Sequence, residues 1–150
     1  MFRLVSCGRD GGPDEAPGLL SDAVQAICDA NAAYYGKAGF VPPWIGYLSV
    51  FDGVIAGGGG FVGPPKQNRV EIAYFTLEEY QGKGMALRTA SALVALAREA
   101  SPGIEIFAKT LPALNASTAI LRRLGFQQIG SVTDAEIGEA WAWLLTAAPP

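Results

Sequence analysis

The sequence contains no histidine among its 150 residues. This absence excludes a Ser-His-Asp triad, a Cys-His pair and a His-ligated metal site, and we expect no metal. Proton transfer must then use a carboxylate, Tyr, Ser, Cys, Lys or water. Cys7 and Cys28 have no metal-binding spacing, and we interpret them as reduced structural residues of a cytoplasmic protein.

Long apolar runs are also missing. No segment approaches the ~20 apolar residues that span a bilayer, and Arg3, Arg9 and Asp10 interrupt any apolar run of a signal peptide. We therefore expect no membrane partner. The net charge of −3 argues against nucleic-acid binding through bulk charge. Half of the residues are hydrophobic, which predicts a single folded domain over residues 1–150.

Positive charge is unevenly distributed along the chain. Of the 11 Lys and Arg residues, eight lie between Lys66 and Arg123. A local basic cluster in an acidic protein favours a phosphorylated ligand, and the alternative is an ordinary solvated helix face.

Hydrophobic periodicity and turn residues predict the secondary structure. Strands are expected at residues 2–6, 44–51, 54–62, 70–76, 104–108, 126–132 and 140–145, and helices at 19–35, 84–100 and 115–124. Ile104 and Phe107 are core candidates. Asp52-Gly53 indicates a hairpin turn. The glycine run 57–60 predicts either a β-bulge or a close approach by another backbone or a ligand.

The stretch 70–87 combines a strand, a short acidic loop at 77–80, a turn with Gly82 and Gly84, and a helix N-terminus. The first N–H groups of a helix lack internal partners and carry positive partial charge. Glycines let the backbone approach an anion closely, and Lys83 and Arg88 add positive charge nearby. These features predict a site for a phosphate or pyrophosphate.

Two common phosphate motifs fail here. Leu87 stands where a dinucleotide fingerprint needs its third glycine, and Pro64 stands where a P-loop needs lysine. The remaining pattern, Gln81-x-x-Gly84-x-Ala86, resembles the signature of the GCN5-related N-acetyltransferases (GNAT superfamily), which cradle the pyrophosphate of acetyl-CoA. A second block at 111–126 resembles their N-x-S…L-x-x-L-G-F segment. Residues 44–130 resemble the branch of ribosomal-protein N-terminal alanine acetyltransferases, whereas the first 43 match poorly.

This resemblance implies an α/β (α+β) GNAT fold: a mixed, mostly antiparallel sheet of six to seven strands, flanked by helices. It implies that the fourth and fifth strands, at 70–76 and 104–108, splay into a V that admits acetyl-CoA as co-substrate. The pantetheine arm would pair with the fourth strand and also contact the start of the last helix, and the pyrophosphate would bind backbone N–H groups. The implied cofactor-binding residues are Phe75, Thr76, Leu77, Gln81, Gly82, Lys83, Gly84, Met85, Ala86, Asn115 and Ser117. An alternative role for Asn115 is purely that of a helix N-cap.

The implied catalytic residues are Glu71 and Ser117. Glu71 matches a strand-four glutamate that serves as base in several relatives; the alternative is a buried glutamate paired with Arg or Lys or hydrogen-bonded to a tyrosine. Leu121 stands where many members have a tyrosine that protonates the departing thiolate. The general acid would then be Ser117 or water, or the protein would have no general acid at all. Lys109 stands where this branch often has His. It would be a poor base unless desolvated, and the alternative is that it is a simple exposed cation.

The expected function is transfer of an acetyl group from acetyl-CoA directly to a primary amine, on a small molecule or a protein N-terminus. The alternatives are a catalytically silent acyl-CoA-binding module and a nucleotide-phosphate-binding protein of other chemistry. We expect the acceptor site to be built from the N-terminal helix and the loops at 63–69 and 133–138. Whether the protein forms a homodimer stays open.

Overall fold

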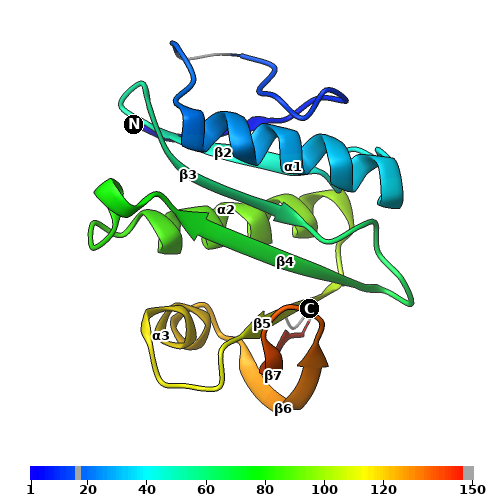
Figure 1. The fold of residues 1–150 in the computed structure, drawn as a ribbon. Coiled ribbons are helices and arrows are strands. Elements are labelled where there is room, and N and C mark those ends of the chain that lie inside the picture. The colour runs from blue at the N-terminus through cyan, green and yellow to red at the C-terminus, as the bar shows by residue number, and fades with distance from the viewer. Residues whose placement is uncertain (16–17, 147–150) are drawn as a thin grey trace.

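A computed structural model describes residues 1–15 and 18–146 of the chain (Figure 1). Its elements are β1 (Phe2–Ser6), α1 (Asp22–Ala38), β2 (Gly46–Phe51), β3 (Val54–Phe61), β4 (Arg69–Thr76), the 3-10 turn η1 (Glu78–Tyr80), α2 (Met85–Ala100), β5 (Glu105–Thr110), α3 (Ala116–Arg123), β6 (Gln127–Asp134) and β7 (Gly138–Leu145). Within the described ranges the strands form one 7-stranded sheet in the order β1-β2-β3-β4-β5-β7-β6. The β4–β5 pair is parallel and the other neighbouring pairs are antiparallel, which confirms the expected mixed sheet.

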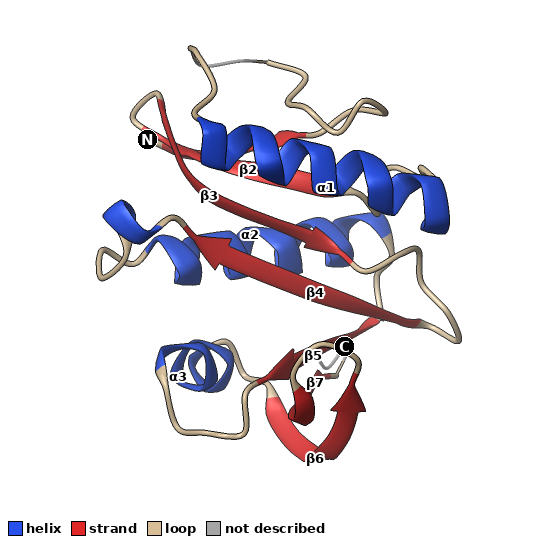
Figure 2. Ribbon diagram, viewed as in Figure 1, coloured by secondary structure: helices blue, strands red, loops and turns tan. Residues whose placement is uncertain are grey.

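Helices α1 and α2 cover opposite faces of the first half of the sheet (Figure 2). Helix α1 is capped by Ser21, whose hydroxyl accepts a hydrogen bond from the Val24 N–H. The Tyr35 hydroxyl fastens this helix to the sheet, because it donates to the Cys7 carbonyl and accepts from the Gly46 N–H, each at 2.9 Å. None of the helices in the described part of the chain is long and apolar enough to cross a membrane.

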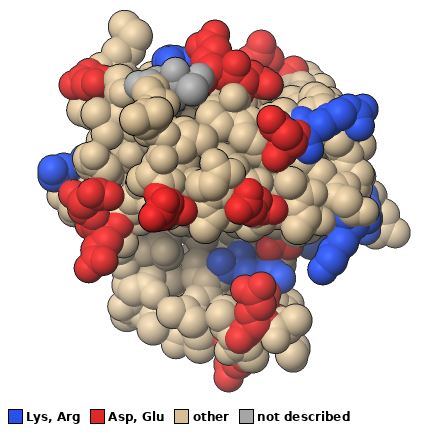
Figure 3. Space-filling model, turned by 45° about the horizontal axis from the view of Figure 1, so that its top comes forward, with Lys and Arg blue, Asp and Glu red and all other residues tan. Residues whose placement is uncertain are grey.

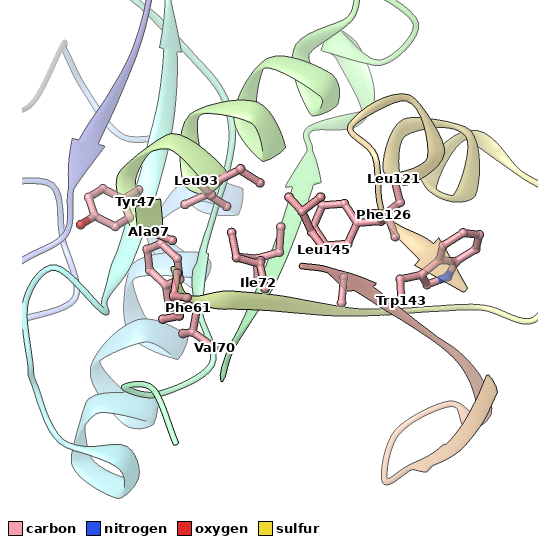
Figure 4. Close-up of a cluster of buried hydrophobic side chains, with 14 of the residues drawn as sticks. Tyr47, Phe61, Val70, Ile72, Leu93, Ala97, Leu121, Phe126, Trp143 and Leu145 are labelled. Carbon is pink, nitrogen blue, oxygen red and sulfur yellow. The ribbon is translucent and has the colours of Figure 1, made fainter. Parts of the chain in front are cut away.

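The main core lies between α2 and the sheet and continues to α3 and β7 (Figure 4). Leu93 and Ala97 of α2 are buried with Ile72 of β4, as the helical periodicity predicts. A smaller cluster beneath α1 contains both cysteines, which are free and buried. Burial raises the pKa of the Cys7 thiol to about 12, so this thiol is not a nucleophile at neutral pH.

A close approach by neighbouring backbones explains the glycine run in β3, and a β-bulge lies directly before it. The pairing of β2 with β3 shifts by one residue beyond Ser49, which leaves Ala56 as a bulge. A Cβ on Gly57 would lie 2.4 Å from the Phe75 carbonyl oxygen, and one on Gly58 would lie 2.5 Å from the Tyr47 carbonyl oxygen. Side chains are therefore excluded here because both neighbouring backbones approach too closely.

Strand β4 changes partner along its length. Residues Arg69–Glu71 pair with β5, whereas residues 72–76 pair with β3 and have left β5 (Figure 1). The Leu77 N–H donates to the Ala56 carbonyl, and the Val62 N–H donates to the Glu71 carbonyl. Because backbone groups alternate in direction along a strand, those of Ile72, Tyr74 and Thr76 face away from β3. The expected V is confirmed, and one of its sides is a free strand edge.

Three sequence-based expectations need correction. Helix α1 runs from Asp22 to Ala38, about one turn later than the range 19–35, because Ser21 caps its start and Gly36 does not end it. Phe107 is only half-buried, since strand alternation gives the core positions to Ile106 and its neighbours at 104 and 108. The loop expected at 133–138 shrinks to three residues, because β6 extends to Asp134 and β7 begins at Gly138.

The glycine run yields a stability prediction. We expect Gly57→Ala to lower the free energy of unfolding by about 1–3 kcal/mol, because its Cβ overlaps the β4 backbone. Gly36→Ala is the matched control: nothing lies within 4 Å of its Cβ position in α1, and we expect about 0.5–1 kcal/mol of stabilisation. Chemical denaturation measures both. Equal stability of the two variants would contradict the close approach.

Candidate active site

The turn before α2 presents unpartnered backbone N–H groups. Gly82 and Gly84 have φ values of 79° and 80°, a left-handed conformation that favours glycine. Gly84 is the N-cap and supplies no side-chain acceptor, so the first N–H groups of α2 remain available to an anion. The Gln81 side chain ties this turn to β4, because its Nε2 donates to the Thr76 carbonyl at 3.2 Å.

A groove of about 650 Å³ runs between this turn, the free end of β4 and helix α3. We call it the cofactor groove; it is lined by Tyr74, Phe75, Thr76, Tyr80, Gln81, Gly82, Gly84, Met85, Ala86, Leu87, Ala116, Ser117 and Ile120. Most of the expected cofactor-binding residues thus line a single groove, although they come from three separate segments.

Leu77, Lys83 and Asn115 are not among the lining residues, and Leu77 lines a separate cavity with Val54 and Ile55 of β3. The Lys83 ammonium lies 5.9 Å from the centroid of the Tyr80 ring. Asn115 is the N-cap of α3 and forms a reciprocal capping box with Thr118, so its side-chain oxygen already has a structural function. Arg88 lies over the ring of Phe51 in β2 and not in the groove lining.

Two hydroxyl groups from β4 are buried without hydrogen-bond partners. They belong to Tyr74 and Thr76, which lie on the same face of β4 and both line the cofactor groove. Burial raises the pKa of Tyr74 to about 12, so this phenol stays protonated at neutral pH. A buried polar group without a partner is unfavourable, and a bound ligand with polar atoms would satisfy it. The groove therefore fits the amide-bearing pantetheine arm that the resemblance implies.

Position 121 cannot supply a proton donor. Leu121 is fully buried and packs in the main core with Phe126 and Trp143 (Figure 4). The O–H donors that line the groove include Ser117 and Tyr74. Tyr74 is a candidate that the sequence reasoning missed, because only its partnerless hydroxyl in the groove distinguishes it from a core tyrosine.

A second cavity, of about 600 Å³, holds Glu71. We call it the acceptor cavity; it is lined by Tyr34, Lys37, Ala38, Val62, Gly63, Pro64, Lys66, Arg69, Glu71 and Phe107. The N-terminal helix and the loop at 63–69, two of the segments expected to build an acceptor site, meet here. Glu71 therefore lies in a different cavity from Ser117.

An ion-pair chain crosses the sheet beside Glu71. The Lys109 ammonium lies 3.6 Å from the Glu71 carboxylate and 2.8 Å from the Asp134 carboxylate. Burial raises the pKa of Glu71, an effect that Lys109 opposes and Asp134 reinforces. Lys109 holds the pKa of Asp134 at about 2, and the hydrogen bond to Asp134 raises the pKa of Lys109. Lys109 is thus a paired cation. The sequence analysis missed Asp134 because only folding brings the end of β6 within reach of Lys109 on β5.

Comparison with known proteins identifies the family. The sequence model of the acetyltransferase (GNAT) domain matches residues 16–127. The chain belongs to the GNAT family. No protein with a curated description matches the sequence. The family assignment agrees with the splayed β4 and β5 and with the cofactor groove beside the free end of β4, and it makes acetyl transfer the general activity.

Solved GNAT-like structures share the fold at low sequence identity. The apo form of RimL, a ribosomal L7/L12 alpha-N-protein acetyltransferase, is 17% identical over 99% of this chain and 95% of its own, with a TM-score of 0.71. The yncA protein of Salmonella typhimurium, solved with its cofactor acetyl-CoA, is 22% identical over 82% of this chain and 78% of its own, with a TM-score of 0.63. A ribosomal-protein-alanine N-acetyltransferase from Brucella melitensis is 17% identical over 75% of this chain and 72% of its own, with a TM-score of 0.60.

The ion-pair chain makes a pH-dependent prediction. Lys109 lowers the pKa of Glu71 against the effect of burial, so Lys109→Met should raise that pKa further, whereas Lys109→Arg should change it little. NMR titration of the Glu71 carboxyl measures both.

Loss of the Lys109 ammonium should also lower the stability of the folded protein. At neutral pH the Lys109→Met protein holds a half-buried Glu71 carboxylate without its cation, so its melting temperature should fall below that of the unsubstituted protein. The difference should shrink as falling pH protonates Glu71 and then Asp134, whose pKa is about 2. A difference that is independent of pH would contradict the pairing.

Proposed function

We propose that this protein transfers the acetyl group of acetyl-CoA in one step to a primary amine, on a small molecule or a protein N-terminus, bound beside Glu71. The observation that carries the proposal is the position of β4 between two cavities. Tyr74 and Thr76 line the cofactor groove, whereas Glu71 of the same strand lines the acceptor cavity. A thioester lying along the free edge of β4 could be reached by an amine from the other side.

The chemistry requires a neutral amine, because a protonated amine has no lone pair. Free amines have pKa values of about 8 for an α-amine and about 10.4 for lysine. The nitrogen of the neutral amine attacks the thioester carbonyl and a C–N bond forms, the Glu71 carboxylate accepts the proton that this nitrogen then loses, and the C–S bond breaks. The departing thiolate takes a proton from a donor in the groove and leaves as CoA.

Strand β4 also polarises the thioester. Its N–H groups at Tyr74 and Thr76 face the V beyond the last pair with β5, where one of them donates to the carbonyl oxygen as negative charge develops. The expected pantetheine pairing, placed near Phe75 to Leu77, moves to Tyr74 and Thr76, because the Leu77 N–H is already bonded to Ala56. Holding both reactants at this edge contributes up to roughly 7–11 kcal/mol toward the barrier in favourable cases.

Glu71 is suited to act as the base because burial raises its pKa toward the working pH, where a carboxylate accepts protons more effectively. Glu71→Gln keeps the side-chain shape and removes the acceptor, so turnover should fall by the ~10²–10⁴ typical of a lost general base. Acetyl-CoA affinity should stay near that of the unsubstituted protein, since Glu71 lies outside the cofactor groove. Steady-state kinetics with free-thiol detection and calorimetry measure the two quantities.

Glu105→Gln is the matched control for this experiment. Glu105 also forms a strand-to-strand ion pair, with Arg69 at 3.2 Å, but it does not line the acceptor cavity. If Glu71 is only an ion-pair partner, both variants should lower the melting temperature and retain turnover per folded molecule. Acetyl-CoA binding without turnover of any amine by the unsubstituted protein would favour a silent acyl-CoA-binding module instead.

The proton donor is tested by a second pair of variants. We assign Tyr74 or Ser117 to this step, since each is a hydroxyl-bearing residue that lines the cofactor groove. Tyr74→Phe removes only a buried hydroxyl that has no partner, so it should not lower the melting temperature. Of Tyr74→Phe and Ser117→Ala, the variant that removes the true proton donor should lower kcat by ~10²–10⁴ and retain acetyl-CoA affinity. The other variant should change kcat little. If neither Tyr74→Phe nor Ser117→Ala lowers kcat, the assignment fails.

A further inference from the structure

The acceptor cavity carries positive charge that no carboxylate in the described ranges neutralises. Lys37 at the end of α1 and Lys66 in the β3–β4 loop line the cavity, and neither forms an ion pair with a described residue. Arg69 also lines it and is paired with Glu105, while Lys109 lies behind Glu71. In a chain of net charge −3, this cavity is a local basic region.

The basic groups lie at one end of a hollow that crosses the molecule. In Figure 3, Lys and Arg side chains gather at the right-hand end of this hollow and also within it, while acidic side chains dominate the surface above. The same end holds the C-terminus of α1 and the β3–β4 loop (Figure 1), which carry Lys37 and Lys66. A charged cavity of this kind attracts ligands of opposite sign and repels those of like sign.

An acceptor that carries only an ammonium group would meet one carboxylate, Glu71, among several cations. An acceptor with an additional anionic group would place its amine at Glu71 and its anion toward Lys37 and Lys66. Nearby cations also lower the pKa of a bound amine, which increases the neutral fraction that attacks the thioester. The charge pattern therefore favours both the binding and the reactivity of an acceptor that carries an additional anionic group.

Building on the proposed acetyl transfer to an amine beside Glu71, we propose that the acceptor is a primary amine that carries an anionic group near the amine. Two sources share this chemistry: a small amino acid with a free carboxylate, and a peptide N-terminus followed by acidic side chains. In both, Glu71 receives the amine proton while Lys37 and Lys66 hold the anion. A neutral or cationic amine of the same size is a poorer acceptor.

Matched acceptor pairs test this proposal. One arm compares β-alanine with β-alaninamide, and the other compares a peptide beginning Ala-Asp-Glu with its Ala-Asn-Gln counterpart. In at least one arm, the acidic member should have a kcat/KM higher by roughly tenfold at low salt, and high salt should reduce that ratio. The arm with the larger ratio identifies the source of the anion.

Charge-reversal variants locate the effect in the cavity. Lys66→Glu should reduce or invert the preference for the acidic member, whereas Arg123→Glu, an equal charge change on α3 outside both cavities, should leave the ratio unchanged. Equal kcat/KM within both pairs, or equal effects of the two variants, would overturn the proposal while leaving amine acetylation intact. Absence of acetylation of every acceptor would instead contradict the proposed function itself, and with it this inference.

Discussion

The change of hydrogen-bond partner along β4 is the constraint on which the rest of the site depends. The strand pairs with β5 only at Arg69–Glu71 and with β3 from Ile72 onward. A strand edge without a partner inside a protein is normally covered, because its N–H and C=O groups pair readily with another chain. Here the edge adjoins a groove that ends at the unpartnered N-terminus of α2, so one extended ligand can satisfy both.

The same strand separates two chemical environments. Side chains of β4 alternate, so Glu71 faces a charged cavity while Tyr74 faces the groove on the other side. In the proposed reaction, the proton that leaves the amine and the proton that reaches the thiolate are therefore handled on opposite sides of one strand. Lys109 pairs with both Glu71 and Asp134, and its charge favours the ionised form of the half-buried Glu71 carboxylate.

Local features of the sequence predicted much of this structure. Asn115 and the Asp52-Gly53 turn lie where their short-range chemistry places them, and the Gly82–Gly84 turn opens α2 as expected. Features that depend on strand alternation or on distant neighbours were not predictable from local patterns. Phe107 faces the acceptor cavity and not the core, and Asp134 meets Lys109 only after β6 and β7 fold back on β5.

The central claim is that the free edge of β4 and the N-terminus of α2 hold the co-substrate together. A crystal structure of the protein with acetyl-CoA tests it most directly. The account predicts pantetheine amides hydrogen-bonded to backbone groups of Tyr74 and Thr76, with the pyrophosphate on N–H groups between Gly82 and Leu87 and the acetyl group directed toward Glu71. A ligand bound elsewhere, or β5 paired with β4 beyond Ile72 so that the V is closed, would contradict it.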